Sequence, residues 1–274
     1  MDKRYSTFRL PCLRRLKKTL GEYDALVEYV ELATRKFKSD FKSQSGLSFQ
    51  EFLSSEANKQ EICLNNLTLE NYESFKNKYY LILPYAAFGS FLSDFKKDFT
   101  FLFGEKYDIQ KCEIKLEPIS KLLEINGFNI SIENWSLNLY DYYRLLRNSL
   151  AHDSDKKIKD IENLYFSIDK KAIHASFPTL SAPHDIDSLA FDDFILFTAN
   201  IKYIAERLTL SLEPKIDWVE FSKHNLTLFP KRNKFEKNKD RLIVYVRNVI
   251  STNYGLSLDD SEIENIINNL PSEL

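Results

Sequence analysis

Apolar residues recur every three or four positions along much of this chain, and no other feature limits its fold as strongly. That period places side chains on one face of an α-helix, whereas a half-buried strand has a period of two. One such face follows Pro11 and predicts a long helix: Leu13, Leu16, Leu20, Tyr23, Val27, Val30, Phe37 and Phe41. Another predicts a helix from Asp185 to Leu212: Leu189, Phe194, Phe197, Ile201, Ile204 and Leu208. With only 6 glycines in 274 residues, we expect a mainly α-helical protein.

Shorter patterns predict the other helices. Pro84 divides two of them because proline lacks the amide hydrogen that a helix interior needs. Ser48 and Ser136 are expected to cap helices. The expected helices are Leu69–Leu83, Tyr85–Phe103, Pro118–Ile125, Leu137–Ala151, a short one around Trp218 and Phe221, Leu242–Thr252 and Glu262–Leu270.

Two segments read as strands. Cys112–Leu116 predicts a short strand, and Leu164–Ile168 and Ile173–Phe177 alternate around Asp169-Lys170-Lys171, which is typical of a small β-hairpin. We place a boundary near residue 214. It separates a helical domain over 1–213, with the hairpin as an insertion, from a helical C-terminal extension over 214–274.

Charge and cysteine content exclude several classes of protein. The formal net charge is -2, so only local patches can attract nucleic acid or an anionic membrane. Cys12, Cys63 and Cys112 are far apart and odd in number, which indicates core thiols and not a disulfide framework or a zinc knuckle. The glycines never take phosphate-loop spacing. No stretch resembles a signal peptide or a membrane span, so we expect a cytoplasmic protein with no membrane association.

Two stretches of the sequence are locally basic, although the net charge of the whole chain is close to zero. Taken alone, each reads as a solvated helix face or an exposed loop. The first comprises Lys3, Arg4, Arg9, Arg14, Arg15, Lys17 and Lys18, and the second comprises Lys231, Arg232, Lys234, Lys237, Lys239 and Arg241.

The strongest chemical signal lies between Tyr140 and Asp153, where Arg147, Asn148 and His152 come together as a predicted helix ends. Histidine titrates near neutrality and can exchange a proton with a ribose hydroxyl or a departing oxygen. Arginine keeps its charge and binds phosphate oxygens. Positions 147 and 152 are about 140° apart around an ideal helix. Both side chains can therefore face one phosphate only if the helix ends near Ala151.

The run Arg147-Asn148-Ser149-Leu150-Ala151-His152 resembles the Arg-x4-6-His signature of the HEPN superfamily (higher eukaryotes and prokaryotes nucleotide-binding domain). The polar residue directly after the arginine and the helical context are part of the resemblance. Many members are metal-independent ribonucleases in toxin-antitoxin, abortive-infection and CRISPR systems. The resemblance implies a HEPN-like helical bundle and an antiviral endoribonuclease that needs neither metal nor cofactor.

The resemblance also implies the partners of the chain. HEPN domains commonly pair about a two-fold axis, so a homodimer would place two Arg147/His152 sets in one RNA-binding groove. Asn148 would orient the histidine or bind phosphate, and an antitoxin or sensor protein is a further expected partner. Ser154 stands where related toxins carry a modifiable tyrosine, which puts that control in doubt. The expected RNA-binding residues are Arg144, Lys156, Lys157, Arg14, Arg15 and Lys18, with Lys159 extending the positive rim.

Two alternatives stay open. Arg147 could pair with a helix carboxylate such as Asp141 while His152 only ends the helix, which would leave a catalytically silent HEPN-like module that binds RNA or protein. Glu113-Ile114-Lys115, with Asp108, has the form of a metal-dependent nuclease site, although its spacing is too short for the usual hairpin. The remaining histidines, His174, His184 and His224, show no partner at a readable spacing and are expected to be surface or core residues.

Overall fold

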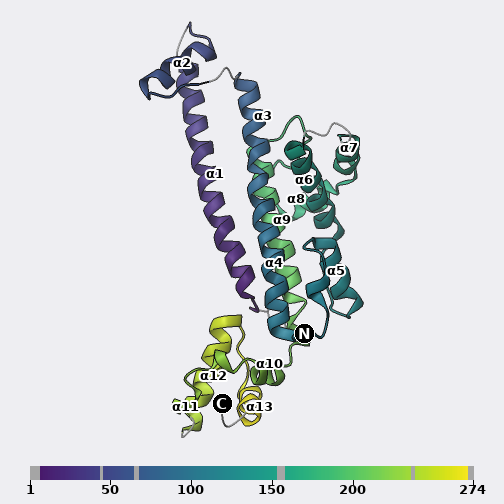
Figure 1. Cartoon of the computed structure of the whole chain (residues 1–274). Coiled ribbons are helices and arrows are strands. Elements are labelled where there is room, and N and C mark those ends of the chain that lie inside the picture. The colour runs from purple at the N-terminus through teal and green to yellow at the C-terminus, as the bar shows by residue number, and fades with distance from the viewer. Residues whose placement is uncertain (1–6, 44–45, 65–67, 153–157, 236–237, 271–274) are drawn as a thin grey trace. The chain divides into compact units, whose positions relative to one another are not determined.

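The computed structural model describes residues 7–43, 46–64, 68–152, 158–235 and 238–270, without the side chains of residues 70, 71, 150–152 and 233 (Figure 1). Every regular element within them is helical, so the mainly α-helical prediction is confirmed. The α-helices are α1 (Pro11–Ser43), α2 (Phe49–Lys59), α3 (Leu69–Tyr80), α4 (Ile82–Phe103), α5 (Leu116–Ile125), α6 (Asn134–His152), α7 (Ile158–Ser167), α8 (Lys170–Ser176), α9 (Phe191–Leu210), α10 (Trp218–His224), α11 (Arg232–Phe235), α12 (Lys239–Tyr254) and α13 (Asp260–Asn269).

The chain divides into two compact units. Unit 1 comprises residues 1–17, 89–132 and 203–274, and unit 2 comprises residues 18–88 and 133–202. The helices α1, α4 and α9 each contribute residues to both units. The predicted boundary near residue 214 therefore lies inside unit 1, whose C-terminal helices share a compact unit with residues from earlier in the chain.

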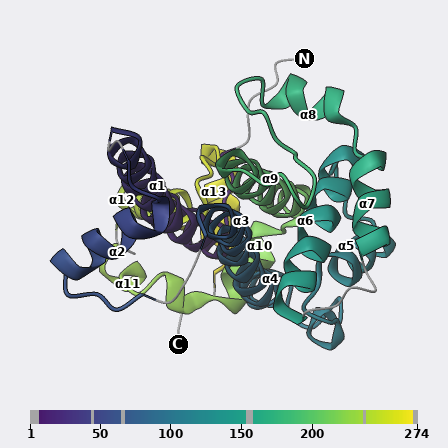
Figure 2. The ribbon, with the colours of Figure 1, turned by 90° about the horizontal axis from the view of Figure 1, so that it is seen from above.

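Unit 2 holds the helix that carries the arginine motif. Its core contains the apolar faces expected for α1 and α9, with Leu20, Val27, Phe194, Phe197 and Ile201 buried. Figure 2 shows α7 beside α6, and the two helices are in contact. This packing covers one side of α6.

Unit 1 has its own apolar core. The helical tail packs on itself through Phe229, Leu242, Val246, Ile250, Leu258, Ile263 and Ile266. A second group of rings surrounds Phe99, which packs against Phe103, Tyr107 and Phe128 in tilted or edge-on arrangements at centroid distances of 4.7–5.7 Å. The expected helices around Trp218 and Phe221, over 242–252 and over 262–270 are confirmed as α10, α12 and α13.

The predicted β-hairpin is wrong, because α7 and α8 occupy its two strands. Ile161, Ile168 and Ile173 are buried, while Phe166 is 81% exposed. The exposed Phe166 produced the period of two that suggested a strand. Asp169, the expected turn residue, instead accepts a hydrogen bond from the amide of Ala172 at 3.0 Å and caps α8.

The predicted strand at Cys112–Leu116 is also wrong. A single 3-10 turn (Ile109–Lys111) precedes it, and α5 begins at Leu116. The buried ammonium of Lys96 donates to the carbonyl oxygens of Gln110 and Cys112. These carbonyls are thereby satisfied by a side chain and do not need a neighbouring strand.

Several helix boundaries differ from the expected ones, and three of these differences have a clear physical cause. Pro84 lies in the first turn of α4, where a missing amide hydrogen costs nothing, and the break falls at Leu81. The helix α9 begins only at Phe191. Asp185 accepts hydrogen bonds from the amides of Asp187 and Ser188 at 3.0 Å, and these bonds hold residues 185–188 in a turn. Ser136 lies inside α6, where its hydroxyl donates to Asn200 at 2.6 Å.

None of the helices in the described ranges has both the length and the apolar character to cross a bilayer.

Candidate functional site

The motif residues lie on the last two turns of α6. Tyr142, Tyr143 and Leu146 form the buried face of this helix, and each has less than 1% of its surface exposed. Arg147 and Asn148 follow on the half-buried flank of the same helix. The apolar face therefore fixes the rotation of α6, and this rotation places the polar motif at the rim of the core.

The guanidinium of Arg147 is positioned by an aromatic ring. Its central carbon lies 4.8 Å from the centroid of the Tyr85 ring, and Nη1 donates to the side-chain oxygen of Asn148 at 3.1 Å. The Nε atom is buried and has no hydrogen-bond partner among the described residues. A guanidinium stacked on a ring keeps its charge and its outward donors, so this one can bind an anion.

The pairing of Arg147 with Asp141 does not form. Asp141 instead accepts a hydrogen bond from Nε of Arg144 at 2.9 Å, within an i,i+3 ion pair. Among the described residues, no carboxylate oxygen lies within 4.0 Å of a side-chain nitrogen of Arg147. Its side-chain hydrogen bond is to the amide oxygen of Asn148. Arg144, one of the expected RNA-binding residues, is the arginine that carries the local ion pair.

The helix α6 extends to His152, one residue beyond the expected end at Ala151. Positions 147 and 152 therefore lie on one helix, about 140° apart around its axis. The side chain of His152 lies outside the described residues, as do Lys156 and Lys157. The helical backbone of one chain therefore does not by itself direct the side chains of residues 147 and 152 toward a single phosphate.

Two arginines of the N-terminal stretch have acceptors within unit 1. Arg14 donates to the carbonyl of Thr252 at 2.8 Å, and Arg15 pairs with Asp94 at 3.0 Å. In unit 2, the more exposed Lys18 lies 3.8 Å from Glu22. These pairs reduce the positive field that the sequence suggested, and they leave Lys18 as the most accessible of the three.

The residues of the metal-dependent alternative are satisfied by neighbouring lysines. Glu113 pairs with Lys115 at 2.6 Å, and Asp108 pairs with Lys111 at 2.9 Å. The hydrogen bond from Lys115 lowers the pKa of Glu113. Within the described residues, no group of three histidine, cysteine or acidic side chains is arranged to hold a metal ion.

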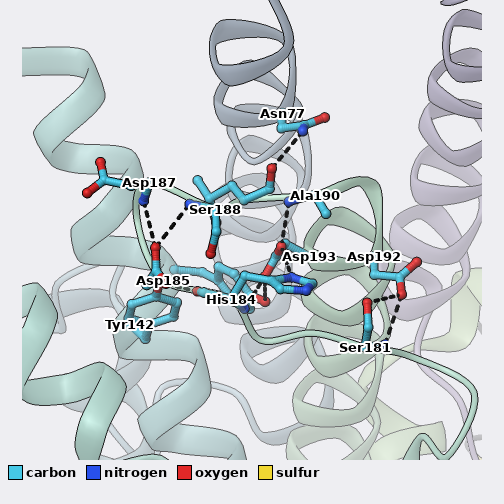
Figure 3. A network of polar contacts seen from close by, with 12 residues as sticks. Asn77, Tyr142, Ser181, His184, Asp185, Asp187, Ser188, Ala190, Asp192 and Asp193 are labelled. Atoms are coloured by element: carbon cyan, nitrogen blue, oxygen red, sulfur yellow. Dashed lines mark hydrogen bonds and ion pairs between the residues drawn. The ribbon is translucent and has the colours of Figure 1, made fainter. Parts of the chain in front are cut away.

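A buried carboxylate that sequence reasoning missed organises the same unit (Figure 3). Asp193, which is 1% exposed, accepts hydrogen bonds from the Tyr143 hydroxyl at 2.8 Å and from the backbone amide of His184 at 2.9 Å. Its second oxygen accepts a hydrogen bond from the Ala190 amide at 2.8 Å and lies 2.8 Å from Nδ1 of His184. Four contacts compensate for the burial of one carboxyl group.

The network fixes the loop between α8 and α9 against α6. The Tyr142 hydroxyl donates to the carbonyl of His184 at 2.6 Å, and Asn77 donates to the carbonyl of Leu189 at 2.7 Å. Burial and the nearby Asp193 carboxylate raise the pKa of Tyr143 far above its ordinary value, so its hydroxyl stays a donor. Its hydroxyl and Asp193 are fifty positions apart, and no local pattern in the sequence links them.

The other histidines and the cysteines are only partly as expected. His184 has a partner in Asp193, and His224 lies 2.8 Å from Glu220, one helical turn earlier. The i,i+4 spacing of Glu220 and His224 is a signal that sequence reasoning overlooked. His174 is exposed on α8. Of the three cysteines, Cys12 is buried, Cys112 is intermediate and Cys63 is exposed.

Comparisons of the chain with protein-family models, with curated proteins and with solved structures found no match.

Proposed function

We propose that this chain is a metal-independent endoribonuclease of the HEPN type, with Arg147 and His152 as its catalytic residues. The observation that carries the proposal is the state of Arg147. Its guanidinium is held over Tyr85, bonded to Asn148 and free of any carboxylate among the described residues. An arginine that served only to stabilise the helix would more usually pair with an acidic neighbour, as Arg144 does.

The proposed reaction is a transfer within the RNA backbone. The ribose 2′-oxygen attacks the adjacent phosphorus, the bond from phosphorus to the 5′-oxygen breaks, and a 2′,3′-cyclic phosphate and a 5′-hydroxyl result. Histidine can accept the 2′-hydroxyl proton or donate one to the leaving oxygen. Arg147 would stabilise the charge that develops on the phosphate oxygens, and Asn148 would orient the histidine or bind phosphate.

A homodimer completes this mechanism. One histidine cannot easily serve as base and acid on opposite sides of an in-line displacement, whereas two copies about a two-fold axis supply one of each. Because positions 147 and 152 are about 140° apart on α6, each copy would bring its Arg147 and its His152 to the groove from different sides of the helix. Arg144, Lys156 and Lys157 would then contact the RNA backbone, whereas Arg14 and Arg15 already have acceptors within unit 1.

The proposed setting is antiphage defence, as a toxin or abortive-infection effector whose activity an antitoxin or sensor protein controls. This part rests on the resemblance of the motif alone. A catalytically silent module that binds RNA or protein is the alternative. The same helical scaffold and the same arginine would serve it.

The test is cleavage of mixed RNA in the presence of EDTA. We expect the wild type to cleave, and Arg147→Ala and His152→Ala each to slow cleavage at least about a hundredfold, since general acid-base catalysis and charge stabilisation each contribute on that order. Cyclic phosphate ends should be detected on the products.

Two variants serve as matched controls. Arg207→Ala removes another arginine stacked on a tyrosine, with 5.0 Å between Arg207 and the Tyr203 ring, and His174→Ala removes an exposed histidine. Both should retain activity. Cleavage that persists in Arg147→Ala and His152→Ala contradicts the assignment, and loss of cleavage with EDTA favours the Glu113 and Lys115 alternative. A folded wild type that never cleaves RNA leaves the binding module.

A further inference from the structure

The outer face of α1 carries an apolar stripe, which we call the α1 stripe: Ala25, Leu26, Tyr29, Leu32 and Ala33. Its three large side chains are unusually open, with Leu26 54%, Tyr29 72% and Leu32 68% exposed. The two alanines are also exposed. The buried residues of α1, such as Leu20 and Val27, belong to the opposite side of the helix. The helix therefore has two apolar faces, and only one of them is used by the core.

The α1 stripe has the geometry of a helix-pairing surface. At 100° per residue, its members all lie within about 60° of the direction of Tyr29. Their spacing of three and four residues is that of the contact positions in paired helices, and Ala25 and Ala33 permit a close approach of the backbones. Tyr29 and Ala33 also border a cleft of about 350 Å³ that is lined by Phe37, Phe49 and Leu53. The exposed apolar surface is thus continuous beyond the helix itself.

Charged residues flank the α1 stripe in a symmetric order. Glu22 and Lys36 lie seven positions before and after Tyr29, and Lys18 and Asp40 lie eleven positions before and after it. All four lie on the same side of the helix as Tyr29, within about 20° of its direction. Each symmetric pair combines one acidic and one basic residue.

This order is self-complementary for two antiparallel copies of α1. If Tyr29 lies on a two-fold axis, Leu26 meets Leu32 of the second copy, and Ala25 meets Ala33. Glu22 then meets Lys36, and Lys18 meets Asp40, so every charge faces its opposite. A parallel pair would instead bring each charge against its own copy, which is repulsive.

We propose that the α1 stripe binds a second copy of this chain, as an antiparallel two-fold pair of α1 helices centred on Tyr29. The ion pairs within α1, Lys36 with Asp40 at 2.6 Å and Lys18 with Glu22 at 3.8 Å, are on exposed side chains and can be exchanged at little cost. The contact runs about 33 Å along the helix. An interface of this length is small, so the dimer should dissociate on dilution.

This pairing does not depend on the proposed ribonuclease activity. In Figures 1 and 2, α1 and α6 lie on opposite sides of α3, so a contact through α1 would not join two Arg147 side chains. The groove proposed for the ribonuclease would need a different contact. Association through the α1 stripe is the part of self-association that the α1 charge variants weaken, whereas a dimer through the ribonuclease groove would persist in them, so each proposal can fail alone.

The test is sedimentation velocity over a wide range of protein concentration. The wild type should dimerise. Glu22→Lys and Lys36→Glu each place like charges together at two symmetric points, and each should weaken the dimer at least about tenfold, equivalent to about 1.4 kcal/mol. The double variant Glu22→Lys/Lys36→Glu restores opposite charges and should dimerise as the wild type does.

The double variant also controls for folding. It disrupts the same pairs within α1 as the two single variants, so a defect in the helix itself would persist in it. A mixture of the two single variants should form heterodimers, because both contacts are then attractive. A monomeric wild type at the highest concentration, single variants that dimerise normally, or a double variant as weak as the single ones would each overturn the proposal.

Discussion

At the scale of single residues, two charged side chains of unit 2 lie in opposite environments. Arg147 lies over an aromatic ring at the edge of the core, and the described residues offer it no opposite charge. Asp193 is fully buried, and each of its oxygens accepts hydrogen bonds from neighbours. The first arrangement leaves a charge available to a ligand, whereas the second uses a charge to hold the fold.

We therefore expect Asp193→Asn to destabilise the protein by about 3 kcal/mol, because an amide nitrogen would face donors that now need an acceptor. Asp192→Asn is the matched control. Asp192 accepts from the amide and the hydroxyl of Ser181 in a more exposed position, and its loss should cost about 1 kcal/mol. Urea unfolding followed by circular dichroism measures both, and equal losses would contradict the role given to Asp193.

At the scale of helices and their ends, local chemistry decided most boundaries. Ser48 caps α2 in a reciprocal arrangement with Glu51, as the sequence indicated. Gly255 ends α12 with a φ of 72°, a left-handed backbone conformation that residues other than glycine rarely adopt. The hydroxyl of Thr7 also donates to the carbonyl of Gly255. Two mispredicted boundaries have a hydrogen bond as their cause. Ser136 donates to the distant Asn200 and does not cap α6, and Asp185 holds a turn that delays the start of α9.

Two glycine substitutions should act in opposite directions. A methyl group at Gly255 would lie 2.3 Å from the carbonyl oxygen of Thr7, so Gly255→Ala should cost at least about 2 kcal/mol through strain and displacement. Gly89 lies inside α4, and apart from its chain neighbours and the backbone of its own helix no atom lies within 4 Å of such a methyl group, so Gly89→Ala should stabilise by up to about 1 kcal/mol. Thermal unfolding of both variants compares them, and a shift of the same sign in both would refute the argument.

At the scale of the whole molecule, each compact unit draws on segments far apart in the sequence. In unit 2, one ion-pair cluster links α1 to α3: Glu31 contacts Lys76, which is nearly buried, and Arg35 at 2.9 Å. Burial acts to raise the pKa of Glu31, but the hydrogen bonds from Lys76 and Arg35 outweigh it, and the pKa is lowered. Such a cluster makes folding depend on pH.

The sign of this dependence follows from the lowered pKa of the folded state. The stabilisation by Glu31 should be fully present above the unfolded pKa, about 4.3, and should be lost as the pH falls through the lower folded value. Glu31→Gln should therefore be less stable than the wild type at neutral pH, with a difference that shrinks below about pH 4. Melting temperatures across this range test the prediction, with the exposed Glu28→Gln as control. A difference that is independent of pH would contradict it.

The sequence by itself determined the helical class, most of the helices and the position of the arginine motif on one of them. These depend on periodicity, caps and spacing, which neighbouring residues specify. The nature of α7 and α8 could not be read in this way, because Phe166 is apolar and yet exposed. Whether Arg147 and His152 catalyse RNA cleavage stays a prediction.

Only the tertiary structure decided which side chains meet across long distances in the chain. Asp193 accepts a hydrogen bond from Tyr143, and Arg147 lies over the ring of Tyr85. Both contacts depend on the packing of helices whose proximity no sequence pattern indicates. The same packing buries Val27 and leaves Tyr29 exposed, although both are apolar residues of α1. Burial depends on what else occupies the space around a helix, and a single helix does not contain that information.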